Sequence, residues 1–342
     1  MKNPLAVKNP VAVKNPLAVS SPLPSSYPET SAARDEWILS RRPERNPIDP
    51  SRPYAFFVED EYSASGEIVP VATIFLTNRE CPWRCLMCDL WKNTLTESVP
   101  VGAIPAQIDY ALARLGPARQ IKLYNSGSFF DRRAIPVENY PAIASRVSDF
   151  ERVIVECHPA LVGESCFRFR ELLSGRLEVA MGLETVHPEI LDRLNKRMTT
   201  DQFAAAAARL RAQGIELRVF ILVKPPFIRE AETLYWAERS LDFAFDCGAT
   251  AATLIPTRSG NGAMEELASS GDFSPPNLAT LEAALTYGIG LERGRVFADL
   301  WDLKLDGECQ LCSPERIARL RKINLRQIIS SPVSCVHCGG KN

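Results

Sequence analysis

The sequence lacks long apolar runs, an excess of charge of one sign and a signal peptide. No apolar stretch approaches the ~18 residues that a membrane-spanning helix needs, which excludes an integral membrane protein. The 40 basic and 41 acidic residues leave a net charge of −1. A protein covered on all sides by nucleic acid is therefore not expected, although a local basic patch is compatible with this balance.

Residues 2–19 repeat the hexads KNPLAV, KNPVAV and KNPLAV. Proline in every copy prevents a continuous apolar helix, so this segment is neither a signal peptide nor a membrane anchor. Pro, Ser and Arg stay frequent in the residues that follow. We therefore expect a disordered, low-complexity leader over residues 1–50 and a cytoplasmic location.

From residue 66 onward, short β-rich runs alternate with amphipathic helical stretches. Six strands are expected, at residues 71–76, 120–124, 152–156, 177–183, 216–223 and 251–255. Most are nearly continuous apolar runs, as in a parallel sheet that is covered on both faces. The pattern predicts an α/β core domain over residues 66–303, either an open doubly wound sheet or a partial barrel.

Polar residues gather where these strands end. They are Ser126, Gly127 and Ser128 after the second strand, Glu156 and Glu184 at the ends of the third and fourth, and Lys224 after the fifth. In both candidate folds the loops at the carboxyl ends of the strands carry the chemistry. We therefore expect these residues to meet at one site.

Three cysteines, Cys81, Cys85 and Cys88, have the spacing C-x3-C-x2-C in the loop after the first strand. Three thiolates can hold three irons of a [4Fe-4S] cube, which leaves the fourth iron open to a small chelating ligand. A three-cysteine zinc site and buried structural thiols are the alternatives. In a reducing compartment, closely spaced cysteines are more often metal ligands or catalytic thiols than disulfides.

This spacing, at this place in a βα repeat, resembles the radical S-adenosylmethionine (SAM) superfamily. The resemblance implies a partial (β/α)6 TIM-like barrel and a [4Fe-4S] cluster whose open iron binds SAM. It also implies reductive cleavage of SAM to a 5′-deoxyadenosyl radical, with a one-electron donor such as ferredoxin or flavodoxin. Met87 stands where the superfamily usually has an aromatic residue, and its thioether can pack on an adenine ring.

The resemblance also implies which residues bind SAM. The segment Ser126 to Ser128 stands where the superfamily has its glycine-rich contact to the methionyl amino group, although the usual acidic third residue is missing. Glu156 and Glu184 are expected to bind the ribose or the amino group, the alternative being surface carboxylates paired with arginines. Lys224 is expected to face the SAM carboxylate or a substrate phosphate.

Longer phrases resemble one subgroup of the superfamily. They are YNSGSFFD at 124–131, VIVECHP at 153–159, MGLET at 181–185 and LVKPPF at 222–227. They are similar to the radical SAM subunit of archaeosine synthase and its bacterial relatives, over roughly residues 70–340. That family implies cleavage of a lysine side chain on a deazaguanine base of tRNA, beside a partner enzyme that transfers the lysine.

Two other hypotheses stay open from the residues alone. One keeps the radical chemistry but gives it a small molecule or a peptide as substrate. The other is a non-catalytic iron–sulfur protein that binds RNA or transfers electrons.

Residues 304–342 form a cysteine-rich extension with two C-x2-C pairs, Cys309 with Cys312 and Cys335 with Cys338. Four thiolates at this spacing are typical of a structural zinc site, and a second iron–sulfur cluster uses the same ligands.

A basic stretch lies between the two cysteine pairs. Arg316, Arg319, Lys322 and Arg326 share one stripe of a predicted helix, while Arg321 points elsewhere. The stripe is expected to contact an RNA backbone or to form a solvated face.

Overall fold

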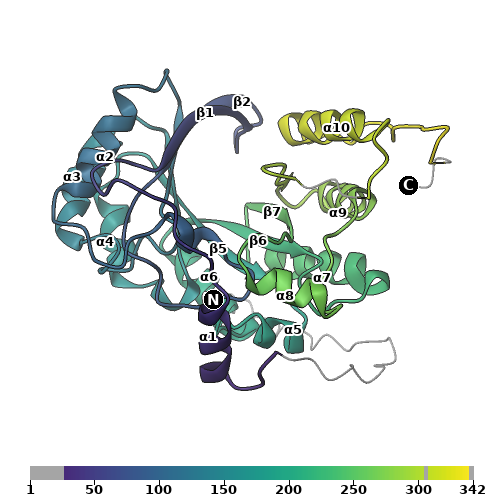
Figure 1. The fold of residues 1–342 in the computed structure, drawn as a ribbon. Helices are drawn as coiled ribbons and strands as arrows, with labels where there is room; N and C mark the ends of the chain where they lie inside the picture. The colour runs from purple at the N-terminus through teal and green to yellow at the C-terminus, as the bar shows by residue number, and fades with distance from the viewer. Residues whose placement is uncertain (1–26, 304–306, 339–342) are drawn as a thin grey trace, which may run out of the picture.

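The computed structural model describes residues 27–303 and 307–338, and its central element is one curved eight-stranded sheet (Figure 1). The strands are β1 (Ala55–Tyr62), β2 (Ile68–Phe75), β3 (Gln120–Tyr124), β4 (Arg152–Glu156), β5 (Arg176–Glu184), β6 (Glu216–Val223), β7 (Ala251–Pro256) and β8 (Arg295–Ala298). They lie in chain order, with β2 to β8 parallel and β1 antiparallel to β2. The expected α/β partial barrel is confirmed.

The six expected strands are all present, and the sheet has two further strands, one at each edge. β1 begins at Ala55, before the expected start of the core at residue 66. Its acidic run, Glu59 to Glu61, breaks the apolar pattern by which we identified the other strands. β8 has only four residues, too few to show a period.

Ten α-helices are described, and those that follow the parallel strands cover the outer face of the sheet. They are α1 (Ser31–Ser40), α2 (Ala103–Leu112), α3 (Tyr140–Arg146), α4 (Glu164–Leu172), α5 (Pro188–Arg193), α6 (Thr200–Ala212), α7 (Thr233–Asp246), α8 (Ala263–Ser269), α9 (Leu278–Gly290) and α10 (Ser313–Arg326). Within the described part of the chain, every helix is too short or too polar to span a bilayer.

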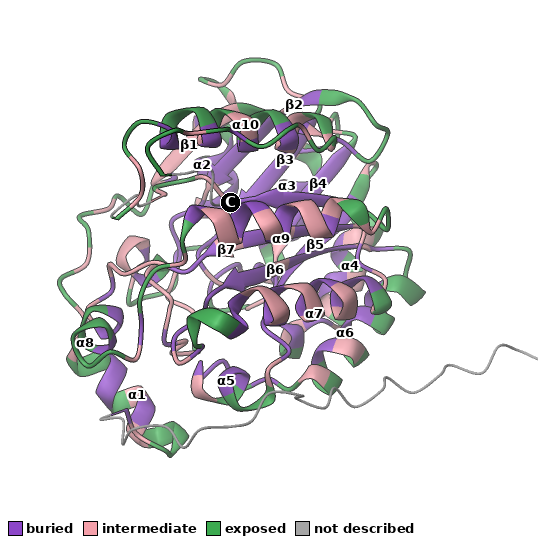
Figure 2. Ribbon diagram, turned by 90° about the vertical axis from the view of Figure 1, so that its right-hand side faces the viewer, coloured by how far each residue is buried: buried purple, intermediate pink, exposed green. Residues whose placement is uncertain are grey.

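The main apolar core lies between the sheet and these helices. Figure 2 shows buried strands behind helices whose outer faces are exposed. Leu123, Val155 and Ile221 of the strands belong to this core, together with Phe203 of α6 and Trp236 of α7. The α6 helix begins at Thr200, where Thr199 and Gln202 form a reciprocal capping box.

The inner face of the barrel carries a buried ion network that the sequence does not reveal. Glu178 on β5 is fully buried and pairs with Arg152, Arg218 and Arg295, at 3.0, 2.6 and 3.1 Å. Burial acts to raise the pKa of the Glu178 carboxyl, but the three guanidinium groups lower it to about 2. Arg218 on β6 and Lys122 on β3 also pair with Glu61 on β1. The network therefore connects six strands, namely β1, β3, β4, β5, β6 and β8.

Helix α10 joins the two edge strands of the half-barrel, since it contacts both β1 and β8. The side-chain amides of Asn324 and Gln327 bond to the N–H and C=O groups of Ala298 and Val296, at 2.7–2.9 Å. These backbone groups lie on the edge of β8 that pairs with no strand among the described residues. The helix therefore satisfies the polar edge that an open sheet would leave free.

The predicted disordered leader is wrong for residues 27–50. Helix α1 buries Trp37 and Ile38 in a second apolar cluster with Leu86 of the cysteine loop and Met264 of α8. The buried Arg34 donates to the backbone oxygens of two other segments. Three large apolar side chains, Tyr27, Trp37 and Ile38, are buried and are enough to order this segment. The hexads lie in residues 1–26, outside the described residues.

Replacing Trp37 by Ala should therefore destabilise the whole protein. Trp37 is only 9% exposed, and truncating a buried Trp to Ala costs about 3–5 kcal/mol in the free energy of unfolding. We expect a lower urea midpoint in unfolding followed by circular dichroism. Leu39→Ala is the matched control, since Leu39 lies on the same helix but is 45% exposed. Equal midpoints for the two variants would contradict the packing of α1.

Candidate active site

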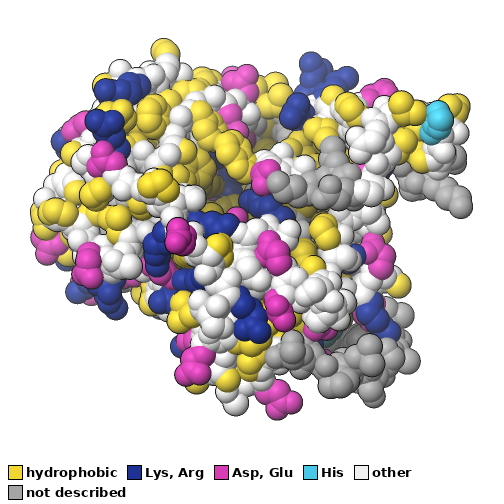
Figure 3. All heavy atoms as spheres, viewed as in Figure 1, with side chains coloured by type: hydrophobic (Ala, Val, Ile, Leu, Met, Phe, Trp, Pro, Cys, Tyr) yellow, Lys and Arg dark blue, Asp and Glu magenta, His cyan; other side chains and the backbone are white. Residues whose placement is uncertain are grey.

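A cavity of about 1110 Å³ opens at the carboxyl ends of the parallel strands and reaches α10. Figure 3 shows a hollow at the centre of this face. Nine of the ten side chains expected at the site line the cavity, namely Cys81, Cys85, Met87, Cys88, Ser126, Gly127, Ser128, Glu156 and Glu184. The loops thus converge on one site, as the sequence indicates.

The cysteine loop is held in place by side-chain amides from distant parts of the chain. Asn261 donates to the backbone oxygens of Leu86 and Cys88, at 2.8 and 3.1 Å. Asn195 donates to the oxygen of Arg84 at 2.8 Å. These two asparagines position the cysteine loop. No motif in the sequence distinguishes them from other polar loop residues.

The three thiols line the cavity and are partly buried. Burial raises the pKa of Cys81, Cys85 and Cys88 to about 12, so binding of iron, and not a nearby protein charge, would hold them as thiolates. Gly127 lies against this loop, since a Cβ atom there would come within 3.2 Å of Cys81 Cβ. A ligand bound at the cysteines would therefore also touch the backbone of the Ser126 to Ser128 segment.

The hydroxyl groups of that segment already have protein partners. Ser128 Oγ accepts a hydrogen bond from the His158 N–H group at 2.7 Å. Ser126 Oγ lies 2.9 Å from the Tyr54 hydroxyl. The segment is thus tied to the loop after β4 and to the start of β1.

The Glu156 side chain also contacts the Ser126 to Ser128 segment, through hydrogen bonds from its backbone. Its carboxylate accepts a hydrogen bond from the Asn125 N–H group at 2.9 Å, and the N–H groups of Ser126 and Gly127 also lower its pKa. Burial outweighs these donors and raises the pKa of Glu156 to about 7. No arginine of the described residues pairs with Glu156, and its contacts hold the Ser126 to Ser128 segment in place.

Glu184 pairs with Lys196, and both side chains are buried beside the cysteines. Burial acts to lower the pKa of Lys196, but Glu184 and the Cys85 sulfur raise it overall. The pair needs a glycine at position 182, because a Cβ atom there would overlap the Glu184 carboxylate and the Lys196 ammonium. Sequence reasoning missed Lys196, which follows a short helix and belongs to no motif.

Lys224 is the one expected site residue that the structure turns away from the cavity. Its backbone adopts a left-handed φ of 56°. Its ammonium pairs with Glu230 and donates to Ser274 Oγ at 2.8 Å. Because these partners satisfy the charge outside the cavity, the expectation that Lys224 faces the cofactor is not met.

His158 is a further cavity residue that we did not predict. Its ring stacks on Trp83 of the cysteine loop, with the ring centres 3.7 Å apart and the planes 12° from parallel. Burial and the nearby Lys196 charge lower the pKa of His158 to about 3, so the ring is neutral. It forms a flat neutral wall beside the cysteines.

Two hydroxyl groups near the cavity are buried and have no hydrogen-bond partner among the described residues. They belong to Thr73 and Thr257, which line the cavity and are 2% and 3% exposed. A buried hydroxyl without a hydrogen bond is costly.

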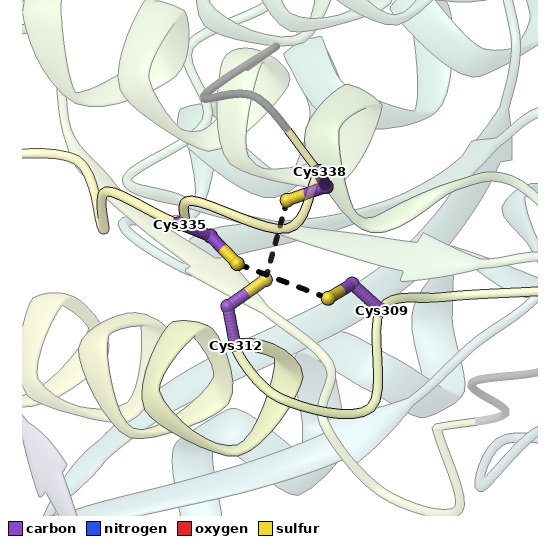
Figure 4. A group of neighbouring side chains, drawn as sticks. All are labelled: Cys309, Cys312, Cys335 and Cys338. Carbon is purple, nitrogen blue, oxygen red and sulfur yellow. Dashed lines mark hydrogen bonds between the residues drawn. The ribbon is translucent and has the colours of Figure 1, made fainter.

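The four C-terminal cysteines converge in a second group. Figure 4 shows that their side chains point toward one another. Cys309 and Cys312 precede α10 in the chain, and Cys335 and Cys338 follow it. All four sulfurs lie within 4.8 Å of one another. The group is suited to hold a metal ion, as the spacing of the cysteines predicts.

The predicted basic stripe on α10 is wrong in two of its four members. Arg316 is buried against Glu282, and Arg319 bonds to Glu282 and to the Ser330 oxygen. These two arginines face inward because α10 packs on α9 through this side. Lys322 and Arg326 are exposed. Arg321, which lies off this stripe, is also exposed and lines the cavity.

Replacing Glu156 by Gln should remove a pH dependence of stability. The pKa of this carboxyl rises from its ordinary 4.5 to about 7 on folding. Between about pH 4.5 and 7 the folded state then binds more protons than the unfolded state, so this group's contribution to stability is lost as the pH rises. Urea titrations at several pH values should show the wild type losing stability relative to Glu156→Gln across this window. Glu138→Gln, at an exposed position, is the control, and a constant difference would contradict the burial of Glu156.

Comparisons with known proteins agree with this site. The Radical SAM superfamily pattern matches residues 75–234. The chain is 26% identical over 325 residues to uncharacterized protein MJ0550 of Methanocaldococcus jannaschii, covering 86% of each chain. It is also 26% identical over 292 residues to archaeosine synthase subunit beta of Methanosarcina acetivorans, covering 77% of this chain and 81% of that one.

Among solved structures, Elp3 of Methanocaldococcus infernus aligns with a TM-score of 0.48 and 14% identity, over 66% of this chain and 60% of that chain. The identification rests on the superfamily match to residues 75–234, which include the three cysteines at positions 81, 85 and 88. The chain belongs to the radical SAM superfamily and is a radical SAM enzyme.

Proposed function

We propose that this enzyme modifies a nucleoside within tRNA. The observation that carries the proposal is the extent of the cavity, which runs from the cysteine loop to Arg321 on α10. Bound at Cys81, Cys85 and Cys88, a [4Fe-4S] cluster with SAM supplies a 5′-deoxyadenosyl radical. The protein's own task is then to hold a substrate at the other end of the same cavity.

The likeness to archaeosine synthase subunit beta supports a tRNA substrate, because it extends over most of both chains. Arg321, Lys322 and Arg326 supply the charge that a phosphate backbone requires. Figure 3 shows dark-blue side chains over α10, at the rim of the hollow. In this proposal a ferredoxin or flavodoxin donates the electron, and a separate enzyme transfers lysine to the base.

A small charged molecule is the second candidate substrate. Lys122 and Arg218 line the cavity together with Glu61, so the inner end of the cavity presents both signs of charge. Such a surface could bind a zwitterion without any contact to α10.

The direct test combines the reconstituted, reduced protein with SAM and with tRNA that lacks the modification. We expect 5′-deoxyadenosine together with a new nucleoside in the digested tRNA, both detected by mass spectrometry. Formation of 5′-deoxyadenosine at one rate with and without tRNA, and no new nucleoside, would overturn the tRNA proposal in favour of the small-molecule substrate.

Replacing Arg321, Lys322 and Arg326 by Gln should weaken tRNA binding and flatten its salt dependence. For each phosphate that the protein no longer neutralises, the slope of log K against log salt falls by about 0.7–0.9. Fluorescence anisotropy with labelled tRNA at several salt concentrations measures both quantities. The matched control replaces Arg209 and Arg211, which are exposed on α6, between β5 and β6 and away from α10. Unchanged binding in the first variant, or equal losses in both, would contradict the role of α10.

We also propose that the C-terminal group holds zinc. A tetrahedral ion with Zn–S bonds of about 2.3 Å places its sulfurs about 3.8 Å apart. The sulfurs of Cys309 and Cys335 are 3.9 Å apart, and those of Cys312 and Cys338 are 3.8 Å apart. In an iron–sulfur cube each thiolate binds its own iron, so the four sulfurs would be spread more widely.

Replacing Cys335 by Ala should remove the zinc and lower stability, because a structural zinc site contributes directly to folding. Metal analysis of the wild type should give about one zinc and about four irons, and the variant should keep the irons. Cys247→Ala, at a lone half-buried cysteine, is the control and should keep both metals. About eight irons and no zinc would show a second cluster instead.

A further inference from the structure

One wall of the cavity is built from aromatic rings. This wall consists of six of the aromatic side chains that line the cavity, namely Tyr54, Phe57, Phe75, Tyr124, Phe220 and Trp301. Neighbouring rings are in contact along the wall, with centre-to-centre distances between 5.4 and 6.4 Å. The wall begins at Tyr54, whose hydroxyl meets Ser126 of the SAM-facing segment, and it continues to Trp301.

The sheet produces this wall by the ordinary alternation of a strand. On β1, Ala55, Phe57 and Glu59 line the cavity, while Phe56 packs on the outer side against Tyr110. Phe75 and Tyr124 stand at the ends of β2 and β3, where the backbones pair directly. The rings therefore form one continuous surface that leads away from the cysteines.

Trp301 lies at the end of this wall and is exposed, which is unusual for so large an apolar side chain. It is 63% exposed, yet its indole lies nearly parallel to the Phe57 ring, 5.6 Å and 10° apart. Its backbone is held on both sides, since its N–H group donates to Asp299 at 2.9 Å and its oxygen accepts from Arg258 at 2.6 Å. The ring is thus fixed in place and open to solvent.

We propose that Trp301 is the stacking platform for a nucleobase of the substrate. One indole face is supported by Phe57, and a planar heterocycle on the exposed surface would continue the series of rings. Base–aromatic stacking and cation–π contacts from arginine are the means by which proteins hold unpaired bases. Arg258 and Arg321 line the same cavity and supply the cations. This inference rests on the proposed function, because it assumes a nucleic-acid substrate.

The test compares two probes of equal length and charge. One is a short fluorescein-labelled single-stranded RNA, and the other is the same sugar–phosphate chain without bases. Removal of a stacking interaction weakens binding by about 5- to 150-fold. Trp301→Ala should raise the Kd for the RNA by this factor and leave the Kd for the abasic chain unchanged. Trp301→Phe should restore most of the affinity.

Two further variants complete the experiment. Leu172→Ala removes a similarly exposed apolar side chain on α4 and should change neither Kd. The triple replacement of Arg321, Lys322 and Arg326 by Gln should weaken both probes, because both carry phosphates. Iron content and thermal unfolding of Trp301→Ala should match the wild type.

Each remaining outcome overturns a different statement. If Trp301→Ala binds both probes as the wild type does, or loses both equally, the stacking site is wrong while the tRNA proposal stands on the triple variant. If the wild type binds neither probe, nor tRNA, the proposed function itself fails.

Discussion

The constraint on which this structure depends is that an open sheet must satisfy its edges. A closed barrel has none, but a half-barrel leaves one edge on its first strand and one on its last. Here α10 reaches both, and two side-chain amides replace the missing strand beside β8. The same helix lines the cavity and lies in the chain between the two pairs of C-terminal cysteines. One short segment therefore protects the sheet edge, borders the cavity and joins the two halves of the four-cysteine group.

The parallel strands and the cysteine loop could be predicted because each follows a local rule. Buried parallel strands are continuous apolar runs, and the spacing of iron ligands is fixed by the cluster. β1 was missed because its inward side chains are acidic and are neutralised by Lys122 and Arg218 on other strands. That compensation is tertiary, so no window of sequence around β1 contains it.

The errors on single residues have the same origin. Arg316 and Lys224 were placed by helical period and by position after a strand, and both rules gave the correct local geometry. Their partners, Glu282 and Glu230, come from other segments and decide where the charges point. Lys196 and Asn261 were missed for the converse reason, since each acquires its role only by contact with a loop that is remote in the chain.

The buried network around Glu178 restricts how this protein can diverge. Removing one partner of a buried ion pair leaves an uncompensated charge and costs about 3–5 kcal/mol, whereas replacing all members by apolar residues is often neutral. Arg152, Arg218 and Arg295 share this single carboxylate. A substitution at only one of these four positions is therefore destabilising and is not neutral in evolution. In descendants and relatives these four positions should be inherited as one block, or exchanged together through a rare combination of substitutions.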